Sequence, residues 1–154
     1  MIQRIQTLWL LISLSLSGFL VKGGIVNFIG NDGQKYFTGF SGIYKMTDTG
    51  TEIIRSSVPL AALIISIPIL SVVTMLLFKF RKVQRVFAFI LITLSVCLTI
   101  LILYYSNIVV NAYEGHIVSG IKMVFPVLII ISAILAVRGI SKDEALVKSY
   151  DRLR

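Results

Sequence analysis

The stretch VPLAALIISIPILSVVTMLLFKFRKVQRVFAFILITLSVCLTILILYY, residues 58–105, decides how this chain folds. Two uncharged apolar runs, residues 58–78 and 86–105, flank the short basic segment 79–85. A hydrocarbon core of about 30 Å needs about 20 apolar residues in a helix, because each residue rises about 1.5 Å and every backbone amide must bond within the helix. Both runs meet that length, so the stretch predicts two membrane-spanning helices joined by a basic turn.

Two further apolar segments precede and follow this stretch in the sequence, at about residues 5–21 and 121–137. The first ends at Lys22, which two helix-destabilising glycines follow, and the last ends at Arg138. We expect the first segment to remain as an anchor rather than to be cleaved as a signal peptide. The sequence therefore predicts a transmembrane domain over residues 1–140, with four spans at about 5–21, 58–78, 86–105 and 121–137 and an outer loop at 22–57.

The composition agrees with a lipid-embedded chain. Of the 154 residues, 56% are hydrophobic and 14% are charged, whereas a soluble domain carries about 25% charged residues. The net charge of +8 comes from basic residues beside the apolar runs, a pattern that reports membrane orientation rather than nucleic-acid binding. The single cysteine, Cys97, lies within an apolar run and reads as a small hydrophobic side chain.

The distribution of lysine and arginine predicts the orientation. With the amino terminus inside, the cytoplasmic segments carry ten of the 15 basic residues and the outer segments carry five. The turn at 79–85 contributes four of the ten, directly beside two spans, where the positive-inside bias is strongest. We therefore predict an inner-membrane, multi-pass protein with both termini in the cytoplasm.

The outer loop contains strand-like sequence. Residues 25–29 and 34–40 are apolar or aromatic runs on either side of Gly30-Asn31-Asp32-Gly33, which predicts a β-hairpin. A second outer loop, at about 106–120, holds Glu114 and His116. Two potential ligands are too few for a metal site, so we expect no metal and no cofactor.

The carboxyl-terminal tail predicts a separate amphipathic helix over residues 141–154. Ser141 and Glu144 match a capping box, and Leu146, Tyr150 and Leu153 follow one helical face. That face needs a surface, and three are open to it: lipid headgroups, the basic loop of this chain, or another protein. The candidate docking residues for lipid or a protein partner are Lys79, Arg81, Lys82, Arg85, Arg138, Leu146, Tyr150, Leu153 and Arg154.

The predicted fold class is thus an all-α membrane protein. It is a four-helix transmembrane bundle with a small hairpin-like outer loop and an amphipathic cytoplasmic helix at its end. The two ends of the chain also resemble a known family. The residues that carry the likeness are MIQRIQT at 1–7, RGI at 138–140, KDE at 142–144, LVKS at 146–149 and DRLR at 151–154. They resemble an uncharacterised family of four-span inner-membrane proteins from Bacteroidetes-type bacteria. The resemblance implies a location and a topology, and it supplies no catalytic residue.

Two functions fit these patterns. The first is a non-enzymatic accessory or scaffold subunit of an inner-membrane assembly, with membrane lipids and other inner-membrane proteins as partners, and neither a nucleic acid nor an identified small-molecule substrate. The alternative is a small uncoupled transporter or lipid-binding protein, in which hydroxyl side chains near Pro68 line a polar seam. That seam would consist of Ser66, Thr74, Thr93, Ser95 and Thr99. An enzyme is the weakest reading, because no nucleophile, acid–base pair or metal set is apparent.

Overall fold

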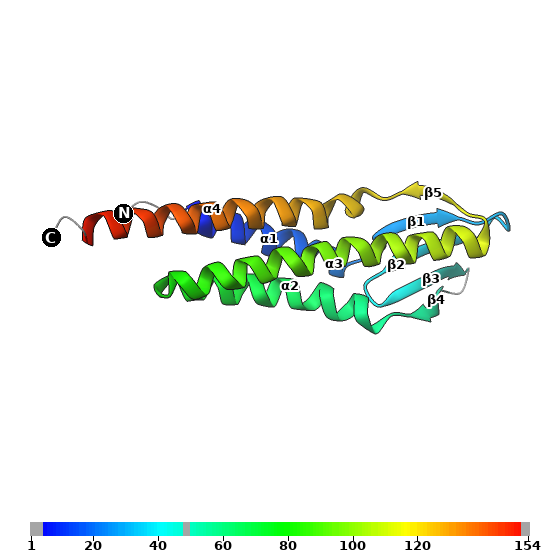
Figure 1. The fold of residues 1–154 in the computed structure, drawn as a ribbon. Coiled ribbons are helices and arrows are strands. Elements are labelled where there is room, and N and C mark those ends of the chain that lie inside the picture. Colours follow the sequence, from blue (N-terminus) through cyan, green and yellow to red (C-terminus); the bar gives the residue numbers. More distant parts are fainter. Residues whose placement is uncertain (1–4, 48–49, 152–154) are drawn as a thin grey trace.

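A computed structural model describes residues 5–47 and 50–151, with side chains as far as Glu144. Four long helices lie alongside one another, and the strands gather at one end of them (Figure 1). The α2–α3 turn and the two ends of the chain lie at the opposite end, here called the inner end (Figure 1). The helices are α1 (Ile5–Val21), α2 (Val58–Leu76), α3 (Arg81–Tyr113) and α4 (Phe125–Asp151), with short 3-10 turns η1 (Leu77–Lys79) and η2 (Ile121–Val124).

The strands form one five-stranded antiparallel sheet. They are β1 (Val26–Ile29), β2 (Lys35–Gly39), β3 (Gly42–Thr47), β4 (Gly50–Ser56) and β5 (His116–Ser119), in the order β4-β3-β2-β1-β5. The predicted hairpin is present as β1 and β2, and Gly33 in its turn has the positive φ of 75° that glycine adopts without strain.

The prediction of an all-α fold with a hairpin-like loop is therefore wrong. The outer loop folds into four strands, and β5 from the second outer loop adds a fifth by pairing with β1. A two-stranded hairpin is marginal alone, whereas three or more strands packed on a helix are stable. The sheet meets that condition because it packs against the outer part of α3.

The prediction of four spans also needs correction. Within the described residues, three helices are long and apolar enough to cross a membrane: α2 with η1, α3, and the segment from Ile121 to Glu144. The apolar helix α1 has 17 residues, which rise about 25 Å against a hydrocarbon core of about 30 Å. α1 packs along α2 and α4.

The predicted tail helix does not start at Ser141. α4 runs without a break from Phe125 to Asp151, so Ser141 lies inside a helix and does not cap one. The last turns of α4 extend beyond the inner ends of α2 and α3 (Figure 1). The tail is therefore a direct continuation of the last apolar helix.

The helices meet along a narrow seam of buried residues. Leu10, Leu91, Leu98 and Ile129 are fully buried in it. Ser13 on α1 and Ser132 on α4 share a hydrogen bond of 2.7 Å across the helices. Lipid gives helices no hydrophobic reason to associate, so close packing and such hydrogen bonds hold these elements together.

Candidate functional site

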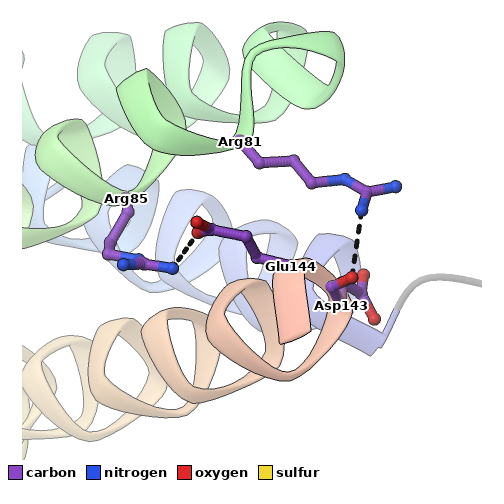
Figure 2. A network of polar contacts seen from close by, with 4 residues as sticks. All are labelled: Arg81, Arg85, Asp143 and Glu144. Atoms are coloured by element: carbon purple, nitrogen blue, oxygen red, sulfur yellow. Dashed lines mark hydrogen bonds and ion pairs between the residues drawn. The ribbon is translucent and has the colours of Figure 1, made fainter. Parts of the chain in front are cut away.

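The inner end carries a polar network between α3 and α4 (Figure 2). Arg85 forms an ion pair with Glu144, and Arg81 Nη1 donates a hydrogen bond to the backbone carbonyl of Asp143 at 3.0 Å. The Arg85 and Glu144 side chains are 34% and 13% exposed. We call this pair of contacts the clasp.

Helical spacing explains why the clasp forms. Arg81 and Arg85 are four residues apart at the start of α3, so they lie on one face, and both reach toward α4 (Figure 2). Between them, Gln84 is buried and donates a hydrogen bond from Nε2 to the carbonyl of Thr74 on α2 at 3.1 Å. The turn is thus tied to both neighbouring helices.

The candidate docking residues whose side chains are described fall into two groups, those that are exposed and those that contact α4. Lys79, Lys82 and Arg138 are exposed, whereas Arg81 and Arg85 contact α4. Leu146 and Tyr150 lie on α4 at positions whose side chains are outside the described residues. Leu153 and Arg154 lie wholly outside the described residues.

We expect Glu144→Gln to loosen the carboxyl-terminal part of α4. The change removes the ion pair and leaves the half-buried Arg85 without its charge partner, at a cost of about 1 kcal/mol, between that of an exposed and that of a buried pair. Thermal unfolding in detergent, together with hydrogen exchange of the α4 end, measures the effect. Lys142→Gln, a charge change at an exposed position two residues away, is the control, and an equal effect from that variant would contradict the clasp.

The opposite end presents the edges of the sheet. All seven residues of β4 are exposed, and Ile53 and Ile54 show 58% and 42% of their surface. The four residues of β5 at the other edge are exposed too. Ile53 and Ile54 lie at a β-bulge: Arg55 pairs with Ile43 and Ile53 pairs with Tyr44, which leaves Ile54 without a partner on β3.

A polar and aromatic contact fixes the sheet on α3. Tyr36 is buried and stacks on Tyr113 of α3 with ring centroids 4.3 Å apart. The Tyr36 hydroxyl donates to Asp32 Oδ2 at 2.8 Å. Burial raises the pKa of Tyr36 to about 12, and the carboxylate of Asp32 adds to this rise. The same hydrogen bond lowers the pKa of Asp32.

These shifts predict how the sheet responds to alkali. Because the folded state holds Tyr36 protonated, its contribution to stability is complete below the ordinary pKa of 10.0 and is lost as pH rises toward about 12. Ultraviolet difference titration of the wild type against Tyr36→Phe isolates this hydroxyl. We expect it to ionise well above pH 10.0, and to ionise earlier in Asp32→Asn. Ionisation of Tyr36 near its ordinary pKa in the wild type would contradict this assignment.

The two potential metal ligands of the second outer loop differ in their surroundings. Glu114 Oε2 accepts a hydrogen bond from Asn31 Nδ2 at 2.8 Å, and His116 is an exposed residue of β5. Over residues 5–47 and 50–144, no group of three or more His, Cys, Asp or Glu side chains is placed to hold a metal ion.

The hydroxyl side chains of the predicted polar seam are hydrogen-bonded within their own helices. Each of its five hydroxyls donates a hydrogen bond to a carbonyl of its own helix, three or four residues back. They are Ser66, Thr74, Thr93, Ser95 and Thr99. Thr93 is exposed on the outer surface of α3.

Sequence reasoning missed two parts of these sites. Strand β5 pairs with β1 from about 90 residues away, and no local pattern reports that register. Glu144 was read as a capping residue, although it pairs with Arg85 on another helix. The i, i+4 spacing of Arg81 and Arg85 was the available signal, because it places two guanidinium groups on one face.

Together, these features define the chain as a membrane protein in which an antiparallel sheet stands on one end of an apolar helical unit. Residues 2–153 match a family described as a domain of unknown function, DUF4293. The chain belongs to this family, which confirms the predicted resemblance to an uncharacterised family and does not address the kind of bacterium. No curated protein and no solved structure matches it.

Proposed function

We propose that the chain is a non-enzymatic accessory or scaffold subunit of an inner-membrane protein assembly. Both ends and the basic turn 79–85 face the cytoplasm in this proposal, and the sheet stands on the outer side. The excess of lysine and arginine at the inner end supports that orientation.

The observation that carries the proposal is the edge strand β4. Among the described strands it pairs only with β3, which leaves the other row of its peptide groups open. Such edges are usually shortened, charged or covered, because an open edge invites another chain to add a strand. β4 has one of these protections, the charged residues Glu52 and Arg55, but it is seven residues long and exposes Ile53 and Ile54 at its centre. An extended segment of a partner protein fits this edge by strand addition.

The projecting end of α4 supplies a second contact in this proposal. The residues beyond the clasp continue α4 past the inner end as one unbroken helix (Figure 1). A preformed helix costs less entropy to dock than a flexible tail does.

Introducing a charge at the edge tests the proposal. Ile53→Lys places a charge on β4, and Ile117→Lys makes the same change on β5, where the side chain is similarly exposed at 54% against 58%. Each tagged variant is purified at native expression from native membranes in mild detergent, and co-purifying proteins are quantified by mass spectrometry. We expect Ile53→Lys to lose at least one stoichiometric partner that Ile117→Lys retains. Recovery of the wild type without a partner, or equal recovery by both variants, would overturn it.

A further inference from the structure

The turn between α2 and α3 exposes apolar and basic side chains side by side. We call residues 76–83 the inner turn. Leu76, Phe80 and Val83 are 71%, 65% and 43% exposed, and Lys79 and Lys82 between them are exposed as well. The apolar and basic side chains therefore share one short surface.

The clasp divides the basic residues of segment 79–85 into two groups. Arg81 and Arg85 point to α4, where Asp143 and Glu144 accept their hydrogen bonds. Lys79 and Lys82 take no part in the clasp and stay exposed. The two lysines are therefore the charges that this turn presents to its surroundings.

The inner turn lies where two apolar helices end. α2 and α3 are each long and apolar enough to span a membrane, and they meet at this turn. Exposed apolar side chains continue along both helices from it, at Val72 on α2 and at Val86 on α3. The surface of the turn is thus continuous with the surface that faces lipid.

We propose that the inner turn is a binding surface for anionic phospholipid headgroups of the inner leaflet. The ammonium groups of Lys79 and Lys82 contact lipid phosphates, while Phe80 and Leu76 enter the boundary between headgroups and acyl chains. Charge complementarity favours this occupant, since the described residues of the inner end include six basic and two acidic side chains. They are Lys79, Arg81, Lys82, Arg85, Arg138 and Lys142 against Asp143 and Glu144.

A protein partner fits this surface less well. An acidic protein would satisfy the two lysines, but it would also have to cover apolar side chains whose neighbours along the helices face lipid. Anionic phospholipid meets both requirements at once. This inference rests on the proposed orientation but not on the proposed role of β4, because it concerns the opposite end of the molecule.

Native mass spectrometry of the full-length protein tests the inference. The protein is released from nanodiscs that contain equal amounts of phosphatidylglycerol and phosphatidylcholine. Each lysine near an anionic surface contributes about fivefold to lipid affinity. We expect Lys79→Gln/Lys82→Gln to lower the enrichment of phosphatidylglycerol roughly 25-fold, and we expect the outer-end control Lys22→Gln/Lys35→Gln to retain it.

A fluorescence arm separates lipid from a protein occupant. Phe80→Trp in a Trp9→Phe background places one tryptophan on the inner turn, because Trp9 is the only native tryptophan. Brominated phosphatidylglycerol should quench it in nanodiscs. The inference is overturned if quenching is absent, if the lysine variant keeps its enrichment, or if a native membrane protein displaces the lipid from the wild type.

Discussion

Gly42→Ala unfolds strands β3 and β4 while the apolar helices remain folded. Gly42 begins β3 with a φ of 152°, and a β-carbon there would overlap the carbonyl oxygen of Arg55 on β4. Backbone strain and steric overlap each cost about 1–3 kcal/mol, so the loss is roughly 2–6 kcal/mol. Gly42 pairs with Gly39 of β2 and with Ser56 of the edge strand β4, so the loss falls on both pairings of β3.

Gly50→Ala is the matched control for this prediction. Gly50 begins β4 with a φ of 144°, yet a β-carbon there meets no atom of the described residues within 4 Å. It therefore adds backbone strain without overlap. Hydrogen exchange of peptides spanning residues 42–56 in detergent should increase far more for Gly42→Ala than for Gly50→Ala. Equal exchange in the two variants would show that the contact with Arg55 is not as described.

Leu98→Ala destabilises the helical unit by roughly 2–4 kcal/mol, whereas Ile100→Ala changes it little. Leu98 is fully buried between helices, so its truncation leaves a cavity and removes packing contacts, which are the main source of helix association in lipid. Ile100 lies two residues further along α3 with 60% of its surface exposed, where lipid fills the space that a smaller side chain leaves.

Unfolding by increasing denaturing detergent compares the two variants with the wild type. A loss of stability in Ile100→Ala as large as in Leu98→Ala would contradict the assignment of the two faces of α3.

The apolar helices could be predicted from sequence because lipid imposes a length on them. The expected span at 58–78 corresponds to α2 and η1, and that at 86–105 lies inside α3. The predicted ends of this helix were less accurate than its centre. The helix starts at Arg81 within the basic turn and continues to Tyr113. Its last turns are longer than a span requires, and Tyr113 there stacks on Tyr36 of the sheet.

The sheet could be predicted only in part, because strand pairing is local in a hairpin and distant elsewhere. The turn sequence Gly30 to Gly33 predicted the β1–β2 hairpin correctly. Residues 42–47 were not recognised as a strand, since their glycine start and mixed polarity give a weak local signal. The exposed β4 lacks the alternation that marks a half-buried strand.

The inner-end network could be predicted only as an alternative. The basic loop of the same chain was one of three surfaces considered for the tail, and Arg81 and Arg85 do contact α4 there. Nothing in the sequence favoured this surface over lipid or a partner, because the two segments lie about 60 residues apart and each is a plausible solvated charge cluster.

Cysteine accessibility in intact cells tests the central claim most directly, namely that the sheet and the inner turn lie on opposite sides of the membrane. In a Cys97→Ser background, Thr51→Cys places a thiol on β4 and Lys82→Cys places one on the inner turn. A membrane-impermeant maleimide added outside should label Thr51→Cys at once and Lys82→Cys only after the inner membrane is opened. Labelling of Lys82→Cys in intact cells, or equal labelling of both positions, would contradict the account.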